Sequence, residues 1–154
     1  MLIETKVKVS YLINGKTKKR TETYLLDREF FSEAEYAVTH LLEADMEVHG
    51  GDVVDFSILS LKQSSIKEID EQTWDNDLQS YIATFRDIFT EDDGTEKQLR
   101  YKLLLWAENL TAANQRAVEL AAQGYNMLIE GIKQVDYIYY SSVDNIPQAE
   151  ESNE

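Results

Sequence analysis

The sequence predicts an α+β protein made of two tandem ββαβ repeats, whose six strands form one antiparallel-rich sheet with two helices packed on one face. Three observations predict this fold. The chain aligns with itself at a displacement of 79 positions, so that Gly15 falls on Gly94 and Ala34 on Ala113. Each copy begins with alternating apolar and polar residues around a glycine turn, as in a β-hairpin. Each copy then continues with apolar residues at helical spacing, followed by a further strand-like segment.

The first repeat, residues 2–66, opens with a hairpin. Apolar residues occupy alternate positions of its first strand: Ile3, Val7, Val9, Tyr11 and Ile13. Asn14-Gly15 supplies the positive φ angles that a tight turn requires. A two-residue loop would pair Val9 with Arg20, whereas a three-residue bulged loop would pair it with Thr21. The sequence leaves this register open.

The first helix is predicted to begin at Ser32, whose hydroxyl would cap the free backbone N–H groups while Glu35 completes a capping box. Residues at helical spacing define its inward face: Ala34, Val38, Leu41 and Leu42. A third strand, rich in β-branched residues and Phe, is expected from Val53 to Leu61.

The second repeat, residues 81–143, follows an acidic connector at 67–80 that contains Trp74. It predicts strands near 81–89 and 97–105, a helix capped by Thr111, and a last strand ending in Tyr139-Tyr140. Because neither repeat can bury its sheet face alone, we expect residues 1–146 to form a single domain. The acidic residues 147–154 begin at the only proline and are expected to be a disordered tail.

Composition narrows the functional classes. The net charge is −14, which disfavours non-specific adhesion to nucleic acid or anionic membranes, and cysteine is absent. Disulfides, thiolate nucleophiles and cysteine-ligated metals are therefore excluded. No apolar stretch approaches membrane-spanning length, and the N-terminal residues do not resemble a signal peptide, so a cytoplasmic location is expected.

No catalytic or metal-binding motif is evident. His40 and His49 lack the carboxylate spacing of a helical zinc site, and Gly50-Gly51 lacks the features of a phosphate-binding loop. The acid pairs Asp52 with Asp55 and Asp92 with Asp93 fall in turns or at strand edges, where acidic residues are common without catalysis. The sequence therefore predicts no catalytic residues, cofactor or metal.

The best candidates for binding are cations and tyrosines. Residues 6–20 carry six basic side chains and no acid, so one hairpin is positive on a negative protein. The candidate binding residues are Tyr11, Lys18, Lys19, Arg20, Lys97, Tyr139 and Tyr140. Lysines on strands also protect exposed sheet edges against aggregation, and this explanation is the simpler one for the hairpin. Adjacent Tyr139 and Tyr140 must point to opposite sheet faces.

A series of short sequence segments resembles a family of domains of unknown function, number 4494, found in small proteins of gut-type bacteria and their phages. The segments are Asn14-Gly15-Lys16 with Lys18-Lys19, Tyr24-Leu25-Leu26-Asp27, Phe31-Ser32-Glu33-Ala34-Glu35, Ser65-Ile66-Lys67-Glu68-Ile69 and Leu103-Leu104-Leu105. The resemblance implies a small accessory protein, plausibly carried by a phage. It implies no activity and no catalytic residues, because none is established for the family.

We therefore expect a non-enzymatic protein that binds a protein partner, such as a host defence or replication factor, through its uncovered sheet face, and that also self-associates through this face as a homodimer. The alternative is a nucleic-acid or nucleotide binder. In that case the basic hairpin and the sheet tyrosines would contact the ligand, with Lys18 and Lys97 on either side of it.

Overall fold

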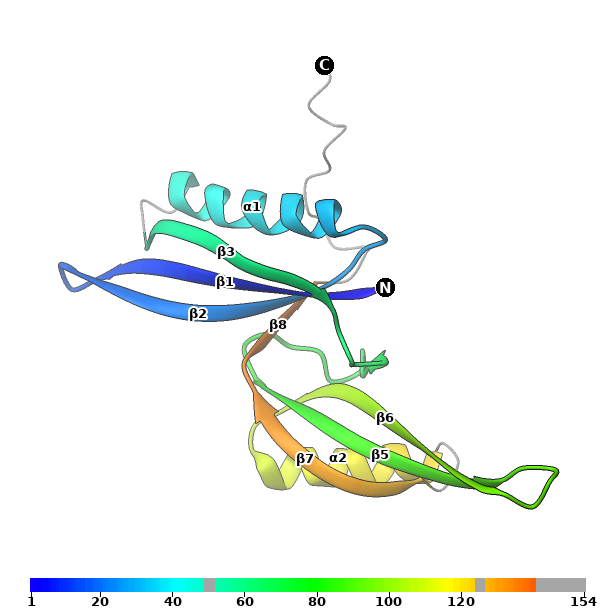
Figure 1. Ribbon diagram of the computed structural model, residues 1–154. Helices are drawn as coiled ribbons and strands as arrows, with labels where there is room; N and C mark the ends of the chain where they lie inside the picture. Colours follow the sequence, from blue (N-terminus) through cyan, green and yellow to red (C-terminus); the bar gives the residue numbers. More distant parts are fainter. Residues whose placement is uncertain (49–51, 124–126, 141–154) are drawn as a thin grey trace. The chain divides into compact units, whose positions relative to one another are not determined.

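The computed structural model describes residues 1–48, 52–123 and 127–140, which divide into two compact units (Figure 1). The first unit comprises Met1–Ser64 with the segment from Tyr137 onward, and the second comprises Ser65–Asp136. The α+β class is confirmed, but the expected six-stranded sheet is wrong. The described residues form two four-stranded sheets. His49, Gly50-Gly51 and the predicted tail at 147–154 lie outside the described residues.

The sheet of the first unit has the order β3-β1-β2-β8. Its strands are β1 (Leu2–Ile13), β2 (Lys16–Asp27), β3 (Val53–Gln63) and β8 (Tyr137–Tyr140). Asn14 and Gly15 form the two-residue turn of the first hairpin, with φ angles of 54° and 77°. This turn pairs Val9 with Arg20 and so settles the register that the sequence left open.

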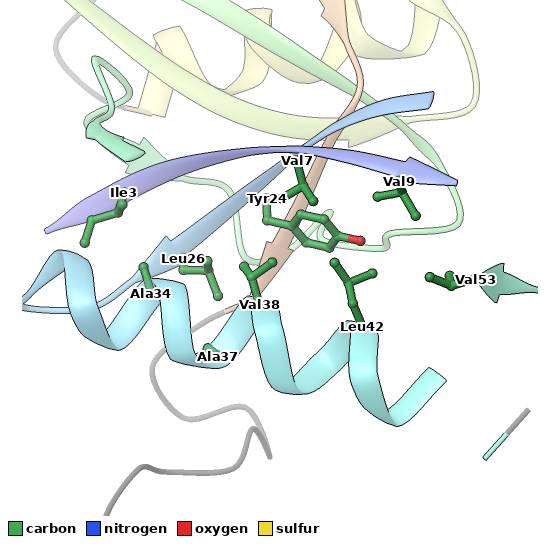
Figure 2. Close-up of a cluster of buried hydrophobic side chains, with 10 residues drawn as sticks. All are labelled: Ile3, Val7, Val9, Tyr24, Leu26, Ala34, Ala37, Val38, Leu42 and Val53. Atoms are coloured by element: carbon green, nitrogen blue, oxygen red, sulfur yellow. The ribbon is translucent and has the colours of Figure 1, made fainter. Parts of the chain in front are cut away.

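Helix α1 (Phe31–Val48) covers one face of this sheet, and the core lies between them (Figure 2). The buried cluster consists of Ile3, Val7, Val9, Tyr24, Leu26, Ala34, Ala37, Val38, Leu42 and Val53. The predicted cap is wrong, because the helix begins one residue before Ser32. The backbone N–H of Phe30 instead donates to Glu33 Oε1 at 3.1 Å, so Glu33 closes the first turn.

The sheet of the second unit has the order β4-β6-β5-β7. Its strands are β4 (Glu68–Ile69), β5 (Gln79–Thr90), β6 (Glu96–Ala107) and β7 (Leu128–Val135). Helix α2 (Leu110–Gln123) covers one face and buries Ala113, Ala117 and Ala121. Its cap is Asn109 and not Thr111, because Asn109 Oδ1 accepts the Ala112 N–H at 2.9 Å.

Each unit takes its fourth strand from the other half of the sequence. β4 follows β3 along the chain but pairs in parallel with β6, through Glu68 opposite Leu103. β8 follows β7 along the chain but pairs in parallel with β2, through Thr23 opposite Tyr137. Both sheets therefore have the same layout: a central antiparallel hairpin, the strand after the helix on one side, and a short parallel strand from the other repeat on the other side.

Candidate functional site

A buried carboxylate lies between two tyrosines on the helix-covered face of the first unit. The Glu22 side chain is 10% exposed, and its Oε1 accepts the Tyr24 hydroxyl at 2.8 Å. The Tyr11 hydroxyl donates to Glu22 Oε2. The Arg20 guanidinium lies 3.9 Å from Glu22 Oε2 and 5.1 Å from the centre of the Tyr11 ring. The structure thus brings together two predicted residues, Tyr11 and Arg20, but joins them to Glu22, which the sequence analysis missed.

Burial, followed by the hydrogen bond to Glu22 and its charge, raises the pKa of the Tyr11 phenol far above its ordinary value. Burial and the Glu22 carboxylate raise the pKa of Tyr24 in the same direction. Both effects follow because phenolate is costly in an apolar site and beside a carboxylate. Tyr11 and Tyr24 therefore remain neutral hydrogen-bond donors.

The other predicted binding residues are dispersed. Lys18 is paired with Tyr11 across the hairpin and shares its face, whereas Lys19 lies on the opposite face. Lys97 belongs to the second unit, where its Nζ lies 3.8 Å from Glu91. The expectation that Tyr139 and Tyr140 point to opposite faces fits their surroundings. Tyr140 packs against the core beneath α1, whereas Tyr139 lies outside that cluster and is 2% exposed.

The tyrosine–carboxylate contacts predict alkaline sensitivity. In the second unit, burial and a hydrogen bond to Glu68 raise the pKa of Tyr101 to about 12. A raised tyrosine pKa contributes stability that is complete below pH ~10 and is lost as pH rises toward the folded-state pKa. We expect urea unfolding midpoints to fall between pH ~10 and ~12. Glu68→Gln should weaken this dependence by lowering the pKa of Tyr101, as measured by tyrosinate absorbance. An unchanged Tyr101 titration in that variant would contradict the assignment.

The second unit contains a pocket of about 530 Å³ beside Tyr101. Its wall is mainly apolar and is formed by Phe85, Leu99, Tyr101, Leu103, Leu120 and Met127. Charged residues at the pocket are Lys67, Glu68, Asp87 and Arg100. Sequence reasoning did not predict this pocket.

The first unit shows why the pocket exists. In the self-alignment, Tyr24 and Leu42 of the first unit correspond to Leu103 and Ala121 of the second. Tyr24 and Leu42 both belong to the buried cluster of the first unit, at 6% and 4% exposure. Smaller side chains therefore leave space in the second unit where the first has packed side chains.

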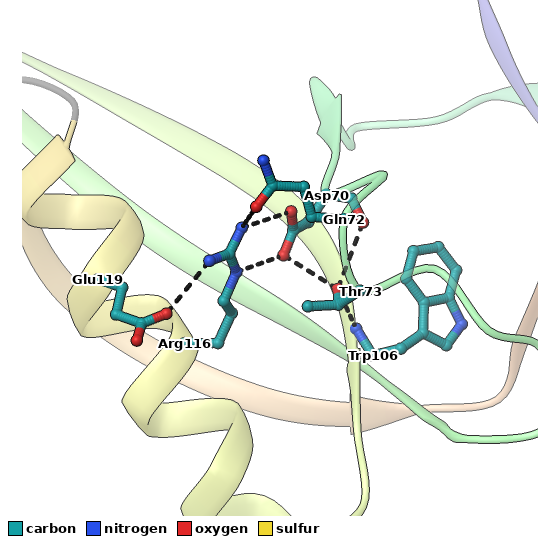
Figure 3. Close-up of polar contacts among 6 residues, drawn as sticks. All are labelled: Asp70, Gln72, Thr73, Trp106, Arg116 and Glu119. Atoms are coloured by element: carbon teal, nitrogen blue, oxygen red, sulfur yellow. Dashed lines mark hydrogen bonds and ion pairs between the residues drawn. The ribbon is translucent and has the colours of Figure 1, made fainter.

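A second polar network, in the second unit, is closed and structural (Figure 3). Arg116 on α2 donates from Nε and Nη2 to both oxygens of Asp70, at 2.8 and 3.0 Å. Asp70 Oδ2 also accepts the Thr73 hydroxyl at 2.9 Å, and Thr73 accepts the Trp106 backbone N–H at 3.1 Å. This bidentate pair joins the segment after β4 to the helix.

The residues that the sequence analysis set aside occupy ordinary positions. His40 is half-buried, with its ring centre 3.9 Å from that of Tyr36. Asp93 shapes the second hairpin turn by accepting the Thr95 N–H at 2.9 Å, and hydrogen bonds with the Thr95 side chain and then its backbone lower the pKa of Asp93. Within the described ranges, no group of three or more His, Cys, Asp or Glu residues could hold a metal ion.

A family model for a domain of unknown function, DUF4494, matches residues 2–139. The chain belongs to the DUF4494 family. The match covers both units of this DUF4494 chain and both exchanged strands, up to Tyr139 of β8. Neither the curated proteins nor the solved structures provide a match to it. In the part of the DUF4494 chain that the structure describes, neither helix has the length and apolar character needed to cross a membrane.

Proposed function

We propose that this protein acts by binding a protein partner, without catalysing a reaction, and that the pocket of the second unit is the docking point. The observation that carries the proposal is the apolar pocket of about 530 Å³ with Leu99 on its wall. Leu99 is 58% exposed, so a large apolar side chain stands at the pocket with much of its surface in water. Exposed apolar surface of this kind is typical of interaction sites.

A protein fits the pocket better than a small molecule does, because the apolar surface continues beyond it. Phe89 is 38% exposed and lies two residues further along β5 from Asp87, which is paired with Leu99. Alternation along the strands places Phe89 and Leu99 on the same face. An apolar side chain of a partner would fill the pocket, while the partner's backbone would cover Leu99 and Phe89.

The surroundings of the pocket supply the polar rim that protein interfaces have. Glu68 and Asp87 are negative and Lys67 is positive, all three at the pocket. Glu68 already accepts the Tyr101 hydroxyl, so its orientation is fixed before a partner arrives. Such pre-organised polar groups favour specific binding.

The polar clusters support binding over catalysis. Asp70 is held by Arg116 and Thr73, and Glu22 is held by Tyr11 and Tyr24. A catalytic carboxylate has to face a space where substrate can sit. Asp70 and Glu22 instead accept hydrogen bonds from side chains of the protein itself.

The test compares two leucine variants. Leu99→Glu places a charge at the pocket, whereas Leu128→Glu places one on β7 at a leucine that is also exposed, at 52%, and does not line the pocket. Both tagged variants and the native protein are incubated with a lysate of the source cells, and retained proteins are compared by mass spectrometry. We expect a partner that the native protein and Leu128→Glu retain and that Leu99→Glu loses at least tenfold.

The same samples are analysed by size-exclusion chromatography with light scattering, which detects self-association through the pocket. A native protein that stays monomeric and retains no protein above the level of Leu99→Glu would overturn the proposal. Circular dichroism checks that both variants are folded, which we expect because both leucines are largely exposed.

A further inference from the structure

We infer that an exposed part of the first unit's sheet, on the face opposite α1, binds the phosphate backbone of a single-stranded nucleic acid. This surface, termed the lysine face, is defined by Lys6, Lys8, Lys19, Thr21, Ser57 and Ser60. It lies on the side of the sheet opposite α1. The inference goes beyond the proposed function, because it concerns a different unit and a different ligand.

Strand register fixes the arrangement of the lysine face. Lys6 lies between Thr23 of β2 and Ser60 of β3. Lys8 lies between Thr21 and Ser57 in the same way. Neighbours of Lys6 and Lys8 in β1, such as Val7 and Val9, are buried beneath α1, so the two lysines point to the other face, where both are exposed. Each lysine is therefore flanked on both sides by hydroxyl groups and has no acid opposite it.

The lysines of this face are not used in ion pairs. Within the described residues, no ion pair is formed by Lys6, Lys8 or Lys19. Edge protection does not explain Lys6 and Lys8, because β1 is paired on one side with β2 and on the other with β3. That explanation remains valid for Lys19, since β8 pairs only with Thr23–Leu26 and leaves the outer part of β2 uncovered.

The second unit also carries cations on the face of its sheet opposite the helix, but at different positions from those of the first unit. The side of its sheet opposite α2 carries Arg86 opposite Arg100, and Thr84 opposite Lys102. Lys133, opposite Ile82, adds a further cation. Glu130 is the acid that meets this group, with its oxygens 3.9 Å from Arg86 Nε and 2.8 Å from Arg100 Nε. Both units therefore place cations on the side of the sheet opposite the helix.

Helix α1 shows that the charge is segregated and not simply scattered. Its 18 residues include five acids and no lysine or arginine. The net charge of the chain is −14, yet on the face of the first sheet opposite α1 the register places four lysines against two acids: Lys6, Lys8, Lys19 and Lys62 against Glu4 and Asp55. An anionic ligand would approach the lysine face and be repelled from the helix.

Phosphodiester backbone matches the chemistry of the lysine face. Lysines two residues apart on a strand stand about 7 Å apart, and serine and threonine hydroxyls donate readily to phosphate oxygens. Three neighbouring strands give a flat surface roughly 10 Å wide, which suits a single strand better than it suits a duplex groove. Exposed aromatic rings are not part of the defined surface, so we expect little base preference and strong salt dependence.

The experiment measures fluorescence anisotropy of a labelled 20-nucleotide oligothymidylate with the intact protein at about 50 mM salt. Lys6→Gln with Lys8→Gln removes two charges from the lysine face. The matched control, Lys16→Gln with Lys18→Gln, removes two charges from the same hairpin outside that face. We expect the first variant to lose affinity roughly tenfold or more and to reduce the salt slope by about 1.4, at about 0.7 per phosphate contact.

The control variant should stay within about threefold of the native protein, since only long-range attraction is lost. No binding by the native protein at low salt would overturn the inference, and so would equal losses in the two variants. Preference for duplex over single strand, or for an acidic peptide over both, would also overturn it. Leu99→Glu should bind the oligonucleotide normally, so failure of the protein-partner proposal leaves this result interpretable.

Discussion

Two fragments cut between Asn76 and Asp77 are expected to fold together far better than either folds alone. The fragment 1–76 keeps β1, β2, α1 and β3 but carries β4, which belongs to the other sheet. The fragment 77–154 carries β8, which completes the sheet of the first. Each fragment therefore lacks a strand that the other supplies. Both residues at the cut are exposed, so the break itself removes little packing.

The measurement is thermal unfolding of each fragment and of their equimolar mixture, followed by circular dichroism. Losing β8 exposes Tyr139, which is 2% exposed in the intact chain, and burying a side chain of this size is worth about 2 kcal/mol or more. This corresponds to a rise of about 10 °C in the midpoint on mixing. A shortened fragment 77–136, without β8, is the control and should fail to stabilise the first unit. Equal midpoints with and without β8 would contradict the exchange.

Removing the Arg116 side chain is expected to destabilise the second unit strongly. The side chain is 16% exposed and satisfies Asp70, whose side chain is 5% exposed. Arg116→Ala leaves that carboxylate buried without its cation, which costs about 3–5 kcal/mol. Urea unfolding should show a lower midpoint with an unchanged slope.

Two variants distinguish the buried pair from general damage to the helix. Glu119→Ala removes a partner of Arg116 that is 61% exposed and should cost less than ~0.5 kcal/mol. The double variant Asp70→Leu with Arg116→Leu removes both charges and should be less destabilised than Arg116→Ala, because no unpaired charge remains. A double variant no better than the single one would show that the carboxylate is not the source of the loss.

The local elements were predictable because their signals are local. Alternation and Asn14-Gly15 identified the first hairpin, and helical spacing correctly placed Ala34 and Val38 on the buried face of α1. The caps were missed by one or two residues, since Ser32 and Thr111 are good capping residues that happen to lie just inside their helices. The alignment was also one residue off in the first strands. Ile3 pairs with Leu26, and Tyr81, not Ile82, pairs with Leu105, the counterpart of Leu26.

The sheet arrangement was not predictable, because it depends on where two very short strands pair. β4 has two residues and β8 has four, too few to show a periodicity that specifies a partner. The sequence analysis placed residues 68–69 in the connector and residues 137–140 in the last strand of the second repeat. Nothing in residues 68–69 or 137–140 indicates that both strands pair with the opposite copy.

The pocket had a signal that the sequence analysis did not use. The self-alignment already placed Leu103 on Tyr24 and Ala121 on Leu42, and both changes reduce volume at core positions. Comparing the two copies for size, and not only for identity, would have indicated a space in the second unit. The tyrosine contacts of Glu22 were harder to predict from the sequence, because a glutamate in a basic hairpin is ordinarily expected at the surface.

The origin of β8 bears on how the protein matures on the ribosome. Domains generally fold in the order of synthesis, beginning at the N-terminus. Here the second unit has all of its strands once Asp136 has been made, whereas the first unit waits for residues 137–140. The first unit, whose synthesis begins first, is thus the last to obtain all of its strands. Until β8 is made, the edge of β2 has no partner strand and can pair with another nascent chain.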